Sequence, residues 1–463
     1  MDMKKLTIMA MALALATGAL ADNVRGAWSG SLNLGATALR IVINIDKDKA
    51  SLDSPDQGAY GIGATLRYCS ADSVAIEVPA LQAAYTARLT GGLLKGTFTQ
   101  AGQAMALDLK PGGVDLKRPQ TPQPPFDYTS EEVRITTPGT DPATGKALAV
   151  GGAQLAGTLL MPAHFAKGGT VVVMVSGSGQ QNRDEELFGH KPFRVIADRL
   201  ARHGIASLRY DDRGVGGSTG HVDGITTYDN MSDALAAVDY LRKQGRFGKI
   251  GILGHSEGGT IAYMIAARQK TDFVVSLAGP ALRGDSILVM QNRDMLRSMG
   301  VDSATVSAYC TALNRIFAYK RTARMEANPE LVLATLTIGL ALPKPLKTNL
   351  AEVIKSHNAW MNYFAAYDPS ADVSHTTCPV MAVGGSRDMQ VNTQANLQAV
   401  SRKLPHPTGK TQWPRYHFVK EYQGLNHLLQ PSTTGLPTEY GQIETTLSEE
   451  VLADLCQWLS ELR

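Results

Sequence analysis

Residues 249–268 read KIGILGHSEGGTIAYMIAAR, and this stretch carries the strongest structural signal in the chain. KIGIL is typical of a buried strand, and GGTIAYMIAAR is typical of a helix. Gly254–Gly258, which lies between them, matches the pattern G-x-S-x-G. A sharp strand-to-helix turn holds a serine above the sheet in a strained conformation, and the flanking glycines leave room for that backbone. The pattern therefore predicts that Ser256 is a nucleophile rather than an ordinary turn serine.

The chain around this stretch alternates strands with helices. Thr170–Val175 (TVVVMV) is a continuous apolar run, as a strand buried on both faces requires. Such alternation predicts the α/β class, with a mostly parallel sheet covered by helices on both faces. The expected strands are 170–175, 205–210, 249–253, 273–277, 379–383 and 417–422, and the expected helices are 192–203, 230–243 and 258–268.

A serine hydroxyl needs a base to remove its proton, and the base needs an acid to orient it. In this architecture the order along the chain is serine, acid, histidine, and the acid follows a late core strand. Asp388 follows the strand PVMAV, and it lies 388−256 = 132 residues after the serine. Asp368 and Asp372 both precede that strand, and we interpret them as solvated loop residues. Asp388 is therefore the predicted acid.

The predicted base is His427, which follows the last expected strand, HFVKEY, by a short loop. It lies 427−388 = 39 residues after the acid. His406 lies before that strand and His417 is its first residue, whereas the base is expected after it, so both are less suitable candidates than His427. His255 is adjacent to Ser256, and adjacency prevents the in-line hydrogen bond that a base must make.

The oxyanion that forms on a substrate needs preorganised donors. One predicted donor is the backbone N–H of Glu257, the residue after the nucleophile. The second is expected from the loop Ser176–Gln180 (SGSGQ), where we favour the N–H of Ser178. An ordinary turn and a phosphate cradle are the alternatives for this loop. No Lys-Ser/Thr pair follows at P-loop spacing, which argues against nucleotide binding.

Two charged stretches lie beside these loops. Residues 211–218 (DDRGVGGS) are interpreted as a structural Asp–Arg ion pair and a tight turn. Residues 183–186 (RDEE) are expected to be solvated, although one of them or His190 could face the substrate.

The N-terminal part of the chain has a different pattern. Many short strands separated by Gly, Asp, Ser or Pro predict a small all-β accessory domain over residues 22–116, either a sandwich or a small barrel. Its role is left open between ordering the cap, forming dimer contacts and binding a glycan. The expected strands are 28–34, 38–45, 64–69, 74–78, 85–89, 93–99 and 105–109.

The Pro-rich residues 117–130 (KRPQTPQPPFDYTS) are predicted to be a linker. The α/β domain is expected to span 131–463. Within it, residues 281–369 are rich in helix formers and lack a convincing core strand, so they predict a helical cap over the sheet. Helices that pack on the flank of the domain are the alternative.

Residues 1–21 (MDMKKLTIMAMALALATGALA) have a basic start, an apolar run and an A-x-A ending. This pattern predicts a cleaved signal peptide and export to the periplasm or the extracellular space, with an uncleaved anchor as the alternative. No later stretch is long and apolar enough to span a bilayer, so no stable membrane insertion is expected.

Composition excludes several other classes. Lys+Arg 45 against Asp+Glu 42 gives a net charge of +3, which gives no reason to expect a nucleic-acid partner. The four cysteines show no CxxC spacing, so a zinc ribbon is excluded. In an exported protein they allow three full disulfide pairings, and spacing does not choose among them. The cysteines are Cys69, Cys310, Cys378 and Cys456.

Together these motifs resemble the secreted two-domain bacterial carboxylesterases of the α/β-hydrolase superfamily. The likeness covers about residues 131–463, and over the N-terminal part it is architectural only. It implies hydrolysis of small-molecule carboxylic esters, typically with short acyl chains, without a metal or organic cofactor. Ser256, Asp388 and His427 match the nucleophile, acid and base of these enzymes. The motifs are SGSGQQNRDEE (176–186), IASLRYDDRGVGGSTG (205–220), GILGHSEGG (251–259), PVMAVGGSRDMQV (379–391) and GLNH (424–427).

The chain departs from this superfamily at one position. Its oxyanion loop begins with Ser176 where many superfamily members have His-Gly. We predict a serine ester hydrolase that forms an acyl-enzyme. The alternatives are a peptidase, amidase or acyltransferase with the same triad, and an inactive hydrolase domain that acts as a binding or scaffolding protein. Both a monomer and a homo-oligomer are compatible with the sequence.

Overall fold

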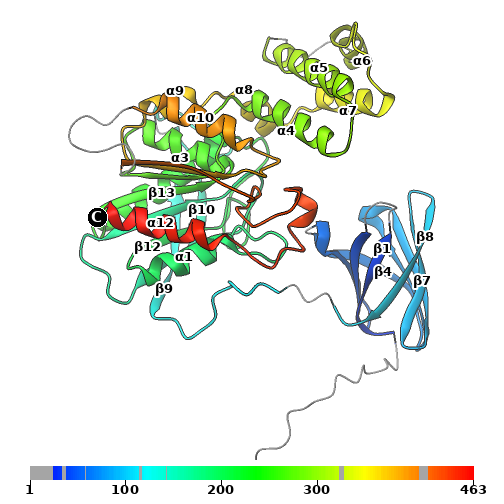
Figure 1. The fold of residues 1–463 in the computed structure, drawn as a ribbon. Coiled ribbons are helices and arrows are strands. Elements are labelled where there is room, and N and C mark those ends of the chain that lie inside the picture. The colour runs from blue at the N-terminus through cyan, green and yellow to red at the C-terminus, as the bar shows by residue number, and fades with distance from the viewer. Residues whose placement is uncertain are drawn as a thin grey trace, which may run out of the picture. The chain divides into compact units, whose positions relative to one another are not determined.

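A computed structural model describes most of the chain (Figure 1). The predicted signal peptide, residues 1–21, lies outside the described residues. The chain divides into two compact units, Met1–Leu116 and Lys117–Arg463, and each is treated separately below. The described residues are 24–33, 38–57, 59–113, 117–141, 143–322, 328–405 and 416–462.

The first unit is a closed antiparallel barrel in which β1 pairs with β8. Trp28, Ile43 and Tyr85 are among the large side chains that fill its interior. The sequence left a sandwich and a barrel open, and it missed β3, which is short and half polar. The strands are β1 (Gly26–Asn33), β2 (Ala38–Ile45), β3 (Ala50–Ser54), β4 (Ala59–Cys69), β5 (Ser73–Val78), β6 (Ala83–Thr90), β7 (Leu93–Gln100) and β8 (Gln103–Pro111), with 3-10 turns η1 (Pro55–Gln57) and η2 (Pro79–Leu81).

The second unit contains an 8-stranded sheet in the order β16-β15-β14-β13-β11-β12-β10-β9. Neighbours from β12 to β16 are parallel, whereas β10 pairs antiparallel with both β12 and β9. The expected α/β class is confirmed. The strands are β9 (Tyr128–Thr137), β10 (Ala153–Pro162), β11 (Thr170–Val175), β12 (Ala206–Tyr210), β13 (Lys249–His255), β14 (Val274–Leu277), β15 (Val380–Gly385) and β16 (His417–Tyr422).

Both faces of this sheet are covered by helices, as the fully buried β11 requires. Because side chains alternate along a strand, Val171 and Val173 pack with α2 and α3, whereas Val172 and Met174 pack with α1 and α12. The covering helices are α1 (Pro192–Arg202), α2 (Thr227–Gln244), α3 (Glu257–Ala267), α10 (Thr393–Lys403) and α12 (Glu449–Glu461), with a 3-10 turn η3 (Pro437–Glu439).

Between β14 and β15 the chain forms a helical insertion with an apolar cluster of its own. The sequence predicted a cap over 281–369, and the helices of this insertion run from Gly284 to His375. They are α4 (Gly284–Ser298), α5 (Ser303–Thr322), α6 (Pro329–Leu336), α7 (Lys344–Lys355), α8 (Ala359–Ala366) and α9 (Ser370–His375). Within the described residues, no helix is both long and apolar enough to cross a membrane.

The Pro-rich stretch predicted as a linker lies against the second unit. Arg118 donates to the backbone oxygens of Phe188 and Gly441 at 2.7 and 3.0 Å. The side-chain oxygen of Gln120 accepts the N–H groups of Thr446 and Leu447. Residues 128–130 already belong to β9, the edge strand where a proline-bounded start is tolerated. The prediction of a linker over 117–130 stays a prediction; the structure adds that Arg118 and Gln120 hold this segment against the α/β unit.

Candidate active site

Ser256 lies on the turn between β13 and α3, with backbone angles of φ 51° and ψ −122°. A side chain is rarely held in this region without a functional reason. The neighbouring glycines are required by close packing. A Cβ on Gly258 would lie 2.1 Å from the backbone oxygen of Val175, and one on Gly254 would lie 1.9 Å from the oxygen of Gly258. The turn thus has the geometry that the sequence predicted for a nucleophile elbow.

The structure brings the three predicted catalytic side chains together. His427 Nε2 lies 3.0 Å from Ser256 Oγ, and His427 Nδ1 lies 2.7 Å from Asp388 Oδ2. The other carboxylate oxygen of Asp388 accepts the N–H groups of Gln390 and Val391, both at 2.8 Å. Oδ2 is therefore aimed at the imidazole, and the carboxylate places the ring proton on Nδ1. Nε2 is then left as an acceptor for the serine hydroxyl.

The loop that carries His427 is held by its neighbour Asn426. The side-chain oxygen of Asn426 accepts the N–H groups of Leu428 and Gln430, both at 3.0 Å. The side-chain amide of Asn426 donates to Gln430 Oε1 at 3.0 Å. Asn426 and Gln430 are fully buried, so this network fixes the backbone next to the imidazole.

The rival acids and bases lie elsewhere. Asp372 accepts the phenol of Tyr367, and Asp368 accepts the N–H and hydroxyl of Ser370. His417 is buried at the start of β16, where its Nε2 lies 3.3 Å from the oxygen of Pro405. His406 lies outside the described residues.

The two predicted oxyanion donors flank Ser256. Glu257 is the first residue of α3, where backbone N–H groups have no partner within the helix. On the other side, a Cβ on Gly177 would lie 3.1 Å from Ser256 Cβ, so the loop passes directly beside the nucleophile. The N–H of Gly177 donates to Glu185 Oε1 at 2.7 Å, so Gly177 is not an oxyanion donor, and Ser178 stays the predicted donor of this loop.

The side chain of Glu257 connects the elbow to the helical insertion. Its carboxylate is buried, and Trp360 Nε1 of α8 lies 2.8 and 2.9 Å from its two oxygens. Burial raises the pKa of Glu257. The insertion therefore reaches the carboxyl edge of the sheet, as a cap does.

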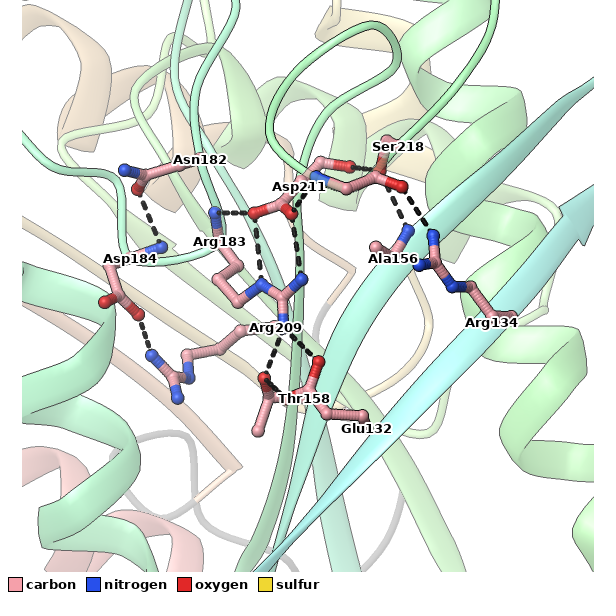
Figure 2. Close-up of polar contacts among 11 residues, drawn as sticks. Glu132, Arg134, Ala156, Thr158, Asn182, Arg183, Asp184, Arg209, Asp211 and Ser218 are labelled. Atoms are coloured by element: carbon pink, nitrogen blue, oxygen red, sulfur yellow. Dashed lines mark hydrogen bonds and ion pairs between the residues drawn. The ribbon is translucent and has the colours of Figure 1, made fainter.

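The charged stretches form a network that the sequence did not predict (Figure 2). Asp211 pairs with Arg183 rather than with its neighbour Arg213. Arg213 pairs instead with the buried Asp233 of α2 at 2.7 Å. Asp184 pairs with the buried Arg209 of β12. The expectation that residues 183–186 are solvated is therefore wrong for most of that loop, and no pattern in the sequence identified these long-range partners.

Asp212 is expected to make stability depend on pH. Burial raises its pKa to about 7, although the Ser176 hydroxyl and the Gln181 N–H favour the charged form. A pKa raised in the folded state means that stability is complete below the unfolded value of 3.8 and is lost as the pH rises through 7. Relative to Asp212→Asn, the wild type should lose about 2 kcal/mol between pH 5 and pH 7.

Urea unfolding of the α/β unit at both pH values checks this. The control is Asp223→Asn, which changes an exposed carboxylate. A difference between wild type and Asp212→Asn that is the same at both pH values would contradict the expectation.

No group of three His, Cys, Asp or Glu side chains in the described part of the chain could hold a metal ion. All four cysteines are described, and all four are free thiols. None of the three disulfide pairings that the sequence left open is formed.

A serine, an imidazole and a carboxylate linked in this order at the carboxyl edge of a parallel sheet define a serine hydrolase of the α/β-hydrolase type. The profile of a protein family described as X-Pro dipeptidyl-peptidase (S15 family) matches residues 140–411. The chain belongs to this family.

One curated relative is the esterase EstD of Thermotoga maritima, 26% identical over 289 residues. The match covers 62% of this chain and 61% of that protein. Two similar solved structures are an esterase, Pf2001, and a protein named Est1E. One, from Pyrococcus furiosus, has a TM-score of 0.41 and 13% identity, and the match covers 72% of this chain and 91% of that one. The other, Est1E from Butyrivibrio proteoclasticus, has a TM-score of 0.40 and 16% identity, with coverage of 72% and 98%.

Proposed function

We propose that the protein is a carboxylesterase-type serine hydrolase that acts on small-molecule esters. The observation that carries this proposal is the Ser256–His427–Asp388 hydrogen-bonded chain beside a serine with a positive φ. The 26% identity to the esterase EstD supports the ester substrate class.

In the proposed reaction, Nε2 of His427 takes the hydroxyl proton while Ser256 Oγ attacks the ester carbonyl. The N–H groups of Ser178 and Glu257 hold the oxyanion. The ester C–O bond then breaks, and His427 returns the proton to the leaving alcohol. A water molecule, deprotonated by His427, then attacks the acyl carbonyl. The bond to Ser256 Oγ breaks, His427 gives the proton to that oxygen, and the carboxylic acid leaves.

A peptidase is the second candidate, because the family profile carries the description X-Pro dipeptidyl-peptidase. Two chromogenic substrates, one for each candidate activity, separate the two: p-nitrophenyl butyrate and Ala-Pro p-nitroanilide, assayed side by side with the same enzyme. We expect kcat/KM for the ester to exceed that for the anilide by at least about 10³-fold, a difference of about 4 kcal/mol in activation free energy. A preference for the anilide would overturn the esterase proposal.

Two finer features belong to the same proposal. The enzyme prefers short acyl chains, which a series of p-nitrophenyl esters from acetate to palmitate tests. It is also exported, since residues 1–21 have the pattern of a signal peptide. Mass spectrometry of the mature N-terminus tests export, and cleavage after Ala21 is the expected result.

A further inference from the structure

Behind the elbow lies a buried pair of ionisable side chains that the proposed reaction does not use. His255 is 8% exposed and Glu185 is 6% exposed. The imidazole of His255 lies beside that of His427, with ring centroids 5.0 Å apart. A small cavity next to the pair is otherwise lined mainly by apolar side chains, among them Phe193, Leu277 and Leu429. The pair is therefore shielded from bulk water.

Both ring nitrogens of His255 face acceptors. Nε2 lies 3.0 Å from the backbone oxygen of His427, and a carbonyl oxygen can only accept, so Nε2 carries a proton. Nδ1 lies 2.9 Å from Glu185 Oε1. The same oxygen accepts the N–H of Gly177 at 2.7 Å, as expected of an ionised carboxylate. With Glu185 ionised, Nδ1 must carry a proton too, so the ring is an imidazolium.

The alternative is a neutral pair in which a protonated Glu185 donates to Nδ1. An isolated histidine is about two pKa units more basic than an isolated glutamate, which favours the charged pair. Burial lowers the pKa of His255, but the charge and hydrogen bond of Glu185 outweigh it, with help from the charge of Asp388, and the net shift is upward. Asp212 also feels the charge of Glu185. His427 is a further titratable neighbour of the pair, and Arg183, Asp184 and Glu186 are charged residues of the loop that carries Glu185.

Two ion pairs hold the residues that directly precede Glu185. Arg183 holds Asp211 with two hydrogen bonds, and Arg209 holds Asp184, as Figure 2 shows. Glu185 itself has a φ of 50°, a left-handed conformation that a non-glycine residue keeps only when its surroundings impose it. The surroundings therefore hold this carboxylate beside Gly177 of the oxyanion loop and His255 of the elbow, and His255 in turn contacts the His427 loop.

We infer that His255 is a permanent imidazolium in an ion pair with Glu185, and that this pair positions the oxyanion loop and the His427 loop relative to Ser256. Glu185 fixes Gly177, and His255 fixes the backbone of His427. Both are positioning residues. The inference rests on the proposed function, since it concerns the same site. The charge state of the His255–Glu185 pair, however, can be measured without any substrate.

The first test is long-range ¹H–¹⁵N NMR of the full chain labelled with ¹⁵N-histidine, at pH 7. The signals of His255 are those absent from His255→Gln. His190 is an internal neutral reference, because burial lowers its pKa to about 4. We expect both ring nitrogens of His255 to show protonated shifts. One unprotonated nitrogen would overturn the inference whether or not the enzyme cleaves esters.

The second test is the pH profile of kcat/KM for p-nitrophenyl acetate. His255→Gln removes the imidazolium but leaves the negative charge of Glu185, and an uncompensated negative charge favours the protonated form of His427. In this variant the acid limb, which is the acidic side of the pH profile of kcat/KM, should therefore lie about one pH unit higher than in the wild type. Glu185→Gln, which removes both charges, should leave the limb in place and lower kcat by about 10² through loss of loop geometry. Glu186→Gln, an exposed neighbour, is the matched control and should match the wild type.

A purely structural pair predicts another result. Both variants would then lose activity by the same factor at every pH, and the acid limb of His255→Gln would not move. That result would overturn the inference.

Discussion

Ser256→Ala is expected to lower kcat/KM for p-nitrophenyl butyrate by at least about 10⁴-fold. The alanine removes the atom that attacks the carbonyl, and no other hydroxyl is held within reach of His427 Nε2 in the described structure. Residual turnover should reflect only binding and the oxyanion donors. Steady-state kinetics at a raised enzyme concentration, with the substrate still in excess, measure the loss.

The control for this variant is Ser307→Ala, which changes an exposed serine of α5 and should leave kcat/KM unchanged. Circular dichroism should show the same fold in both. A fluorophosphonate probe should label wild type and Ser307→Ala but not Ser256→Ala. Near-wild-type turnover by folded Ser256→Ala would disprove the assignment of the nucleophile.

Asp388→Asn is expected to lower kcat by about 10⁴-fold, while KM changes far less. In the wild type, Oδ1 accepts two backbone N–H groups, so an asparagine must keep its oxygen there. Its NH₂ group then faces His427 Nδ1 and donates to it. The imidazole is driven into the tautomer with its proton on Nε2, and that nitrogen can no longer accept the hydroxyl proton of Ser256.

The matched control is Asp372→Asn, which changes the rival acid that contacts Tyr367 and should retain activity. If Asp372→Asn were inactive and Asp388→Asn active, the acid would have been assigned to the wrong loop.

The parts of the fold that follow local rules were predictable from the sequence. β11 and β16 were predicted with the bounds that they have, because an unbroken apolar run and a segment between turns are local signals. The turn at Ser256 was also predicted, since its glycines and flanking elements are contiguous. Asp388 and His427 each follow a late core strand, and this position predicted that they lie near Ser256, where the structure places them.

The missed features depend on pairing across the chain. β9 and β10 form the antiparallel edge of the sheet, and β9 begins three residues after Pro125, so its first residues were predicted as part of a Pro-rich linker. Glu185 and Arg183 were missed for a similar reason. A run of four charged residues is normally solvated, and only partners such as Asp211 and His255, contributed by β-strand ends elsewhere in the chain, bury it.

A chimera that takes its helical insertion from a homologue must replace the hydrogen bonds that the indole N–H of Trp360 donates to Glu257. Moving α8 away from α3 would remove the hydrogen bonds that Trp360 makes to the buried Glu257 carboxylate, at a cost of about 1–3 kcal/mol. A grafted insertion therefore needs a donor at the equivalent position, or an apolar replacement for Glu257 in the recipient. Without one of these changes, the graft would weaken the very turn on which the nucleophile stands.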